Sequence, residues 1–312
     1  MSESVDAYVI GRGLARLRRS TALLLVTAAY LLAGAVGVGI GASGAGWHPL
    51  LAAFLGDLAA TVVVFGISMV VGNSSLYDPY WSVAPPAIAA GWLAVAAGLP
   101  ARQVLVMVVM LAWAVRLTAN WAIGWSGLSH EDWRYVRMRR QTRGRLPWWL
   151  VSFGGIQLVP TLVVFVGLLP VWPALAGNRA LGAVDLLGCV VTVAAVTLET
   201  VADRQLHRFT GDPANRGKVA EVGVWRWCRH PNYLGEIGFW WGMWLFGLAA
   251  APGWWWTVIG PLTMVALFVF ASVPLMDRRS RERRPGYAEY ASRVPALLPR
   301  PPRRQTHGSD HG

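Results

Sequence analysis

Apolar residues fill most of this chain in long runs, and short polar segments separate the runs. Several runs approach or exceed the roughly 20 residues that an α-helix needs to cross the hydrocarbon core of a bilayer. They predict an all-α fold, a polytopic transmembrane helical bundle with about eight spans. The predicted spans cover residues 20–41, 48–72, 83–99, 101–123, 148–171, 180–203, 235–251 and 254–276.

The third predicted span is the weakest of the eight. It is short, and Pro85 and Pro86 lie near its start, where proline removes backbone hydrogen-bond donors from a helix. If this segment does not cross the membrane fully, the bundle has seven spans.

We expect the bundle to form one domain over residues 20–299, because the apolar runs leave no room for a separate soluble domain. Residues 1–19 are predicted to form a basic cytoplasmic segment before it. Residues 300–312 are polar and proline-rich, a composition typical of a disordered tail.

The charge distribution supports the same fold. Only 14% of the residues are charged, against about a quarter in soluble domains, and the net charge is +12. With eight spans, all 28 Lys and Arg residues except Arg102, Arg116 and Arg179 lie on one side of the membrane. Positive charge collects in cytoplasmic loops, so we expect both termini on the cytoplasmic side of a bacterial inner membrane. This topology accounts for the basicity without a nucleic-acid partner, and the two cysteines, Cys189 and Cys228, indicate neither disulfides nor a metal site.

A few ionisable residues lie inside the predicted spans or at their cytoplasmic ends. Arg116 is roughly two turns inside span four, and Glu199 and Asp203 share one helix face near the end of span six. Such residues are costly in a bilayer and are functional candidates, although Arg116 could also snorkel to the headgroups. With their neighbours at the same membrane face they predict one shared polar pocket. Those neighbours are Arg204, His207, Arg208, Arg229, His230 and Asn232.

Two predicted cytoplasmic loops are rich in aromatic residues. The loop "SSLYDPYWSVAPP" (74–86) has no Lys or Arg and could form a turn with an interfacial aromatic belt, or a wall of a site for an apolar substrate. In the second case Tyr77, Asp78 and Tyr80 are the catalytic candidates. They would donate a hydrogen bond to a carbonyl oxygen, with Asp78 protonated in apolar surroundings. The loop "LSHEDWRYVRMRRQTRGRLPWW" (128–149) interleaves aromatic residues with arginines and is typical of an interfacial helix.

The last third of the chain carries the most specific motifs. The segments "DRQLHRF" (203–209), "GVWRWCRHPNYLGEIGFWWG" (223–242) and "GPLTMVALFVFASVPLMDRRSRERRPGYAEYASRVPALLP" (260–299) form an ordered set. Together they resemble the membrane oxidoreductase family that shares the C-terminal domain of the steroid 5-alpha-reductases, closest to its bacterial and plant branch. The stretches "YDPYWSVAP", "RLTANW" and "GLSHEDWRY" also resemble that branch, so the resemblance covers nearly the whole chain after the first span.

The resemblance implies an NADPH-binding pocket that opens to the cytoplasm and is formed mainly by the C-terminal half, at about 180–299. By position, Asp203, Asn232 and Arg279 match cofactor contacts of those reductases. Arg116 matches an arginine that is present in them.

Two departures from the family pattern concern the substrate. Glu199 stands where those enzymes have an asparagine, and Trp113 stands where their steroid-carbonyl tyrosine would fall. The residue that polarises the substrate therefore does not carry over, and neither does specificity for steroids.

The residue types also suit NADPH by their own chemistry. Its 2′-phosphate and pyrophosphate favour arginine side chains, and a carboxylate or an amide can bind the ribose or the nicotinamide. Taken singly, each arginine is also explained as a cytoplasmic charge, and His230 before Pro231 could bind phosphate or cap a helix. The predicted cofactor-binding residues are Arg116, Asp203, Arg208, Arg229, His230, Asn232, Tyr233, Arg279 and Arg283.

Three functions follow as hypotheses. The favoured one is NADPH-dependent reduction of an activated carbon–carbon double bond in a steroid-like or other lipid, without an obligate protein partner. The alternative is an S-adenosylmethionine-dependent methyltransferase of lipids or prenylated thiols, which the core at 229–233 and "YAEY" (287–290) would suit. The many arginines weigh against it, because S-adenosylmethionine has no phosphate. A transporter would be expected to show internal repeats, which the sequence lacks.

Overall fold

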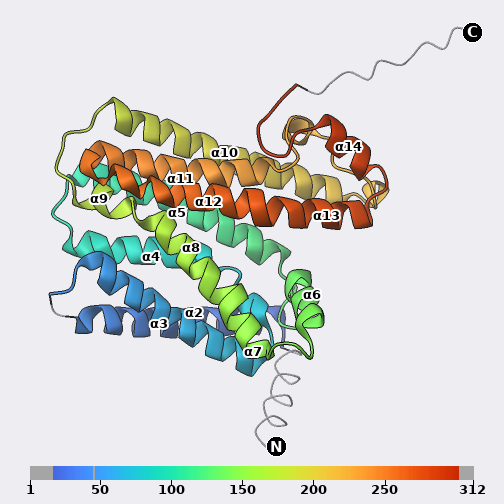
Figure 1. Ribbon diagram of the computed structural model, residues 1–312, viewed down its shortest axis with the longest axis horizontal. Helices are drawn as coiled ribbons and strands as arrows, with labels where there is room; N and C mark the ends of the chain where they lie inside the picture. The colour runs from blue at the N-terminus through green and yellow to red at the C-terminus, as the bar shows by residue number, and fades with distance from the viewer. Residues whose placement is uncertain (1–16, 45, 302–312) are drawn as a thin grey trace, which may run out of the picture. The chain divides into compact units, whose positions relative to one another are not determined.

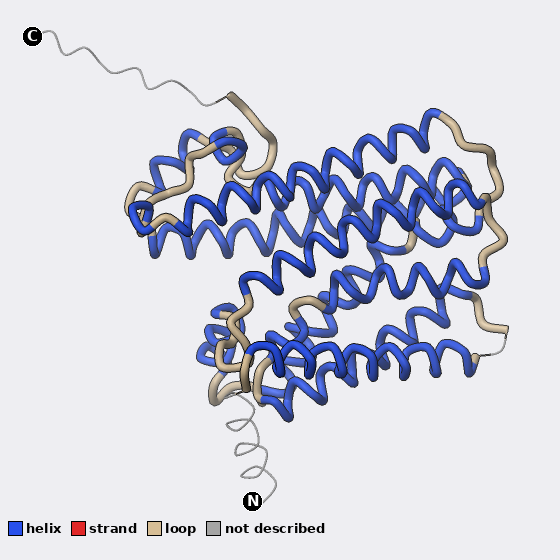
Figure 2. Tube along the Cα trace, turned by 180° about the vertical axis from the view of Figure 1, so that it is seen from behind, coloured by secondary structure: helices blue, strands red, loops and turns tan. Residues whose placement is uncertain are grey.

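The structure of this chain is a computed structural model that describes residues 17–44 and 46–301. Helices dominate throughout, and no β-strand occurs within those two ranges (Figure 2). The predicted all-α fold is therefore confirmed for the described residues. Most of the predicted basic N-terminal segment (residues 1–16) and of the predicted polar tail (residues 302–312) lies outside the described residues.

Within residues 17–44 and 46–301, six helical stretches are long and apolar enough to cross a membrane, so the chain is an integral membrane protein. A bilayer admits such stretches because a helix satisfies its own backbone hydrogen bonds. The stretches are α2 (Arg19–Ser43), α3 (Pro49–Val71), α5 (Pro100–Gly124), Trp148–Ala176, α10 (Ala183–Gly211) and Pro252–Arg283.

Two of the six stretches are composite helices that contain a π-helical segment. Trp148–Ala176 is made of α7 (Trp148–Val151), η2 (Ser152–Leu158), α8 (Val159–Leu168) and α9 (Val171–Ala176). Pro252–Arg283 is made of η5 (Pro252–Val258), α12 (Ile259–Leu267), η6 (Phe268–Ser272) and α13 (Val273–Arg283). The π-helical segments are η2 and η6, and such segments are frequent at functional sites.

The remaining two predicted spans are not among these six. The predicted span 83–99 corresponds to α4 (Tyr80–Val95), whose 16 residues reach about 24 Å, less than the hydrocarbon core. The predicted span 235–251 corresponds to α11 (Pro231–Ala250), which has 20 residues. The count of eight spans and the cytoplasmic position of both termini stay predictions.

Shorter helices connect these stretches. They are η1 (Ser74–Tyr77), α6 (Trp133–Thr142), η3 (Pro213–Asn215), η4 (Gly223–Arg226) and α14 (Tyr287–Arg293). The chain divides into two compact units. The first unit contains the residues up to Asp185 together with Met243–Gly260, and the second contains Leu186–Gly242 and the residues from Pro261 onward.

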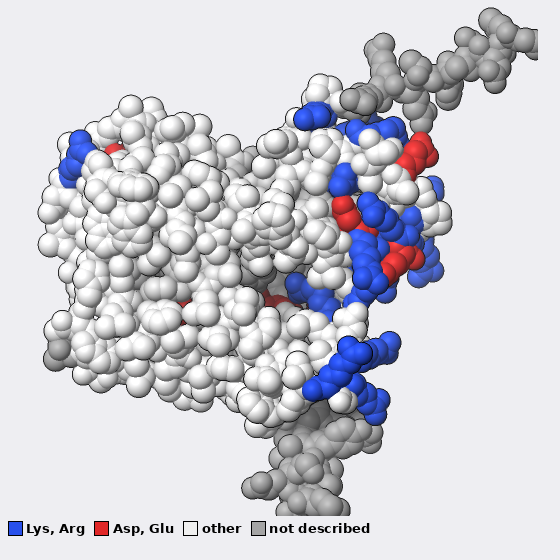
Figure 3. Space-filling model, viewed as in Figure 1, with Lys and Arg blue, Asp and Glu red and all other residues white. Residues whose placement is uncertain are grey.

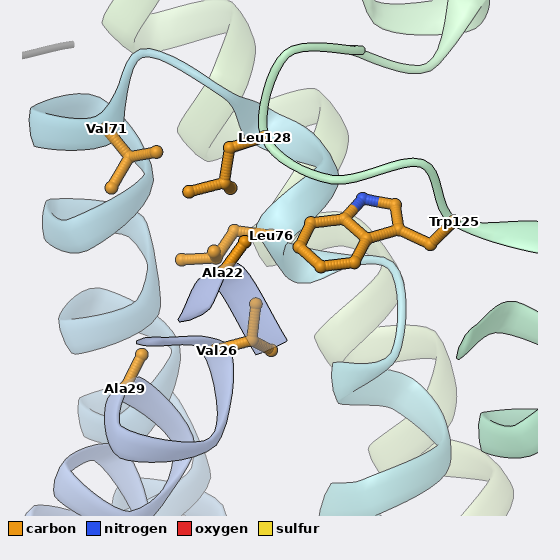
Figure 4. Packing of buried hydrophobic residues seen from close by; sticks show 7 residues of the cluster. All are labelled: Ala22, Val26, Ala29, Val71, Leu76, Trp125 and Leu128. Carbon is orange, nitrogen blue, oxygen red and sulfur yellow. The ribbon is translucent and has the colours of Figure 1, made fainter. Parts of the chain in front are cut away.

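In the first unit, α2 and α3 pack closely along their length (Figure 1). A methyl group added at Gly56 would lie 2.6 Å from the carbonyl oxygen of Gly37, so only glycine permits this approach. At the other end of the pair, an apolar cluster fixes the loop that contains η1 (Figure 4). The cluster consists of Ala22, Val26, Ala29, Val71, Leu76, Trp125 and Leu128.

In the second unit, small residues allow α10 and α11 to pack closely. A methyl group at Gly235 would lie 2.3 Å from Cγ of Glu199, and one at Gly242 would lie 2.0 Å from Oγ1 of Thr192. The glycines of "NYLGEIGFWWG" thus form the contact face of α11, and Glu199 is buried against it.

Candidate functional site

The loop that carries Tyr77 and Asp78 is held against the loop before α6. The Nδ2 atom of Asn73 donates to the carbonyl oxygens of Leu128 and His130, at 2.9 and 3.2 Å. The Oδ1 atom of Asn73 accepts from the backbone N–H of Ser75 and begins η1. One buried amide side chain therefore both starts η1 and ties it to the second loop.

Two further hydrogen bonds join the same loops. The backbone N–H of Ser74 donates to Oε1 of Glu131 at 3.0 Å, and the backbone N–H of Asp132 donates to Oγ of Ser75 at 2.7 Å. The two aromatic motifs, "SSLYDPYWSVAPP" and "LSHEDWRY", thus form one structural unit, which neither motif shows by itself.

Asp78 turns toward α6. Its carboxylate accepts a hydrogen bond from the hydroxyl of Tyr135, and Nη2 of Arg134 lies 3.5 Å from its Oδ1. Burial raises the pKa of Asp78 to about 6, against the opposing effects of the Arg134 charge and the Tyr135 hydrogen bond. Burial likewise raises the pKa of Tyr135, and the neighbouring Asp78 charge adds to the effect.

The raised pKa of Asp78 predicts a pH dependence of stability. The folded protein holds this proton more tightly than the unfolded chain, whose aspartates titrate near about 3.9. The contribution of Asp78 to the free energy of unfolding is therefore fully present below about pH 4 and is lost as the pH rises through about 6. The free energy of unfolding can be measured by titration with a denaturing detergent at several pH values between about 4 and 7. Over this range the wild-type protein should lose stability relative to Asp78→Asn. Parallel pH profiles for the two proteins would contradict the assignment.

Tyr80 and Tyr77 belong to a different, buried polar cluster. The hydroxyl of Tyr80 donates to Oδ1 of Asp57 on α3 at 2.7 Å. The hydroxyl of Tyr77 shares a hydrogen bond with Oγ1 of Thr161 at 2.8 Å, and Oγ1 of Thr61 lies 2.9 Å beyond. The two tyrosine rings are 5.3 Å apart.

The three predicted catalytic residues are thus divided by the fold. Tyr77 and Tyr80 share one cluster, whereas Asp78 pairs with α6. Asp57, which completes the cluster, was not identified from the sequence, although an aspartate inside an apolar run is itself a signal.

Gln157 lies near this cluster along the chain and is fully buried. It belongs to the π-helical segment η2, one turn before Thr161. Neither amide atom of Gln157 has a hydrogen-bond partner among the described residues. A buried amide without hydrogen-bond partners is uncommon. It indicates that a bound group, such as a water or a substrate, supplies those partners.

The predicted cofactor residues fall in both units. Arg116 lies half-buried on α5 in the first unit. The other eight lie in the second unit: Asp203 and Arg208 on α10, Arg229 and His230 before α11, Asn232 and Tyr233 in its first turn, and Arg279 and Arg283 on α13. A pocket shared by all nine stays a prediction.

Arg229 and His230 converge on Asp277 of α13. The Nη2 atom of Arg229 lies 2.7 Å from Oδ2 of Asp277, and Nε2 of His230 lies 2.8 Å from its Oδ1. The hydroxyl of Tyr287 donates to the same Oδ1 at 2.5 Å. Burial raises the pKa of Tyr287, and its hydrogen bond to Asp277 adds to the effect. Asp277 is therefore the hub of this site, that is, the carboxylate that Arg229, His230 and Tyr287 all contact.

The same segment is tied to the end of the described chain. The backbone N–H groups of Arg229 and His230 donate to the carbonyl oxygens of Pro295 and Ala296, at 2.9 and 3.1 Å. The hydroxyl of Tyr290 donates to the carbonyl oxygen of Trp225 at 2.6 Å. The motif "RHPNY" (229–233) and the tail motif "YAEY" (287–290) thus lie together around Asp277 and form one wall of this candidate site.

The side chains of the other predicted cofactor-binding residues are more exposed to solvent. Arg208 and Arg283 are exposed, while Asp203, Asn232 and Arg279 are half-buried. Figure 3 shows Lys and Arg side chains gathered around α13 and α14. The ring of Tyr233 stacks parallel to that of His230 at 5.2 Å, which fixes the imidazole from a second side.

Comparison with known proteins places the chain in a family. Residues 64–294 match the sequence model of the family described as "Protein of unknown function (DUF1295)". The chain belongs to this family. It is also similar to the uncharacterized protein C594.04c of Schizosaccharomyces pombe, with 30% identity over 281 residues that cover 81% of this chain and 80% of the relative. No solved structure matches.

The family match includes most of both candidate sites, while Asp57 and Thr61 of the first site lie before it. It begins within α3 after Asp57, and it covers the loop of Tyr77 to Tyr80, α6, and the wall around Asp277. The two motif clusters that define the sites are therefore parts of the family's own region of the chain.

Proposed function

We propose that the chain is an NADPH-dependent integral-membrane reductase, related to the steroid 5-alpha-reductases, that acts on an activated carbon–carbon double bond in a lipid. The observation that carries the proposal is the buried hydrogen bond between Tyr80 and Asp57, set among apolar side chains. A phenol hydroxyl held in such surroundings can donate to a substrate carbonyl oxygen. That donation stabilises the negative charge that develops when a hydride adds to the β-carbon of an enone.

The pair can reach the required arrangement by taking up one proton from solvent. With a proton on Asp57, the carboxyl donates to the phenol oxygen, and the hydroxyl of Tyr80 is released toward the substrate. Tyr77 packs against Tyr80 and keeps its own hydroxyl on Thr161, so it orients the ring of Tyr80. The apolar surroundings of these rings suit a lipid substrate and exclude water.

The second unit supplies residues that fit NADPH in charge. Arg208, Arg279 and Arg283 would hold the 2′-phosphate and the pyrophosphate, and the amide of Asn232 would bind the ribose or the nicotinamide. Arg229 fits this role less well, since its Nη1 already donates to two backbone carbonyls and its Nη2 to Asp277. In this proposal Arg229 and His230 have a structural role: they hold the segments around Asp277 in place. When bound, NADPH would supply the hydride.

Binding measurements test the cofactor. The thermal unfolding midpoint of the purified protein in detergent should rise saturably with NADPH, and Arg208→Gln with Arg283→Gln should weaken that binding. Stabilisation by S-adenosylhomocysteine with none by NADPH would instead favour the methyltransferase. No response to either ligand would contradict both enzymes.

Tyr80→Phe tests the catalytic assignment. We expect kcat/KM to fall about 100-fold for NADPH oxidation with an enone substrate, as when one donor to a developing oxyanion is removed. NADPH binding should not change. The matched control is Tyr30→Phe, which removes a phenol hydroxyl whose partner is the carbonyl oxygen of Leu76 and whose ring packs on Tyr80. Equal activity in Tyr80→Phe and the control would rule out Tyr80 as the donor.

A further inference from the structure

Gln157 is a buried polar side chain that the proposed reaction does not use. It is fully buried, and neither Oε1 nor Nε2 of its amide has a hydrogen-bond partner among the residues that the structure describes. It belongs to the π-helical segment η2, a kind of segment that is frequent at functional sites. An amide left unsatisfied in apolar surroundings costs free energy, so its partners come from a group that the protein binds.

The contacts on either side of Gln157 show which helix face it occupies. One turn earlier, the ring of Phe153 packs on that of Phe65 on α3, with the ring centres 5.0 Å apart. One turn later, Oγ1 of Thr161 shares a hydrogen bond with Oγ1 of Thr61 on α3 at 2.9 Å. Gln157 therefore faces α3, between these two contacts.

The neighbouring polar side chains on this face already have partners. The hydroxyls of Ser74 and Ser152 share a hydrogen bond at 3.0 Å, on one side of Gln157. On the other side, the hydroxyl of Tyr77 lies 2.8 Å from Oγ1 of Thr161. These hydroxyls bond to one another and not to the amide, which leaves the amide to a bound group.

The chemistry of the amide restricts what that group can be. Nε2 of Gln157 donates and Oε1 accepts, so a single group that satisfies both atoms must itself accept and donate. An alcohol hydroxyl does both, whereas the oxygen of a ketone or an ester only accepts. A carboxylate cannot donate, and its charge would be buried beside an uncharged amide. The amide of Gln157 therefore suits an alcohol best.

The distance from Asp57 indicates where on a lipid that alcohol would lie. The turn of α3 that Gln157 faces follows Thr61, one to two turns from Asp57, which is roughly 5–11 Å along the helix axis. Tyr80, the proposed donor to the substrate carbonyl, is held on Asp57. A lipid that contacts both Tyr80 and Gln157 thus carries its hydroxyl several carbon atoms away from its carbonyl.

We propose that Gln157 binds a hydroxyl group of the lipid substrate, so that the substrate is an enone lipid with an alcohol at a distance from its carbonyl. The inference rests on the proposed function, because it names the substrate class of that same site. The hydroxyl would accept from Nε2 and donate to Oε1, and Gln157 would thereby select hydroxylated lipids over lipids that lack the hydroxyl.

Ligand binding to the full-length protein in neutral detergent tests the proposal. It is measured as the saturable rise of the thermal unfolding midpoint, with NADP⁺ present so that no reduction can occur. The probes are a cyclic and a linear long-chain enone lipid, each with and without one hydroxyl at the end away from the enone. We expect the hydroxylated member of at least one pair to bind wild type at least tenfold more tightly, and Gln157→Leu to reduce that preference to less than twofold.

Gln103→Leu is the matched control. It removes an amide of the same unit that already has partners, because Nε2 of Gln103 donates to the carbonyl oxygens of Ala96 and Leu175, at 3.2 and 2.9 Å. We expect this control to lower the midpoint without ligand and to leave the hydroxyl preference unchanged. Gln157→Leu should not lower that midpoint, because it removes no hydrogen bond within the described residues.

Three outcomes would overturn the proposal. Equal or absent binding of the two members of both pairs would mean that the protein recognises no such hydroxyl. A preference that survives Gln157→Leu would assign the hydroxyl to another residue. A lower midpoint without ligand in both Gln157→Leu and Gln157→Met would show that the amide has a structural partner, such as a held water.

NADPH oxidation with the same enone lipids reports on the proposed function separately. A hydroxyl preference in binding that depends on Gln157, without any oxidation of NADPH, would contradict the reductase alone. Oxidation with no hydroxyl preference would contradict the role of Gln157 alone.

Discussion

Asp277→Asn is expected to lower the free energy of unfolding by roughly 3–5 kcal/mol, because it removes the only charge partner that the described residues provide for Arg229. The side chain of Arg229 is only 12% exposed, so water cannot replace the lost carboxylate. The amide keeps a single acceptor oxygen. If that oxygen still accepts from His230 and Tyr287, the amide NH2 group faces Nη2 of Arg229, and two donors oppose each other. Unfolding of purified protein in a denaturing-detergent titration measures the change.

The same substitution should loosen the end of the chain. Tyr287 would lose the charged acceptor of its hydrogen bond, and the segment 287–297 depends on this site for its position. Limited trypsin digestion should then cut after Arg293 faster than in wild type. Glu282→Gln is the control: it removes a carboxylate from the same helix, but from an exposed pair with Arg278, and should cost less than about 1 kcal/mol. Wild-type stability in Asp277→Asn would show that Asp277 is not the hub.

Arg102→Met is expected to cost a similar amount, roughly 3–5 kcal/mol, because it leaves the carboxylate of Asp185 buried without its cation. Arg102 is fully buried, and its Nε and Nη2 atoms lie 2.7 and 3.1 Å from the two oxygens of Asp185. The Nη atoms also donate to the carbonyl oxygens of Gly177 and Ala180. This one side chain joins the start of α5 to the start of α10.

A double substitution separates the charge effect from a general loss of packing. Arg102→Met with Asp185→Leu removes both charges together, and we expect it to recover at least half of the stability that Arg102→Met loses. Arg179→Met, at an exposed position in the same loop region, should be nearly neutral. If the double variant is less stable than Arg102→Met, the pair does not act through its charges.

The sequence predicted the helices well because membrane insertion depends on local composition. A run of about 20 apolar residues is readable without knowing what it packs against, and six such stretches occur in the described residues. The ambiguous cases were α4 and α11. Pro85 and Pro86 had already marked the first of these as a weak span.

The sites were predicted only in part. "YDPYWS" and "RHPNY" were identified as important segments, and both form dense hydrogen-bond clusters. Their partners were not identified. Tyr80 pairs with Asp57, 23 residues away, and Arg229 pairs with Asp277, 48 residues away.

Hydropathy and motif spacing thus determined the all-α membrane fold, the apolar spans and the segments that carry chemistry. Only the tertiary structure decided which side chains pair: Asp57 with Tyr80, Asp277 with Arg229 and His230, and Asp185 with Arg102, 83 residues away. The physical reason is that burial of a charge requires a partner, but any helix packed alongside can supply it. Local spacing therefore marks where a polar group is needed, and the packing of distant helices chooses the group.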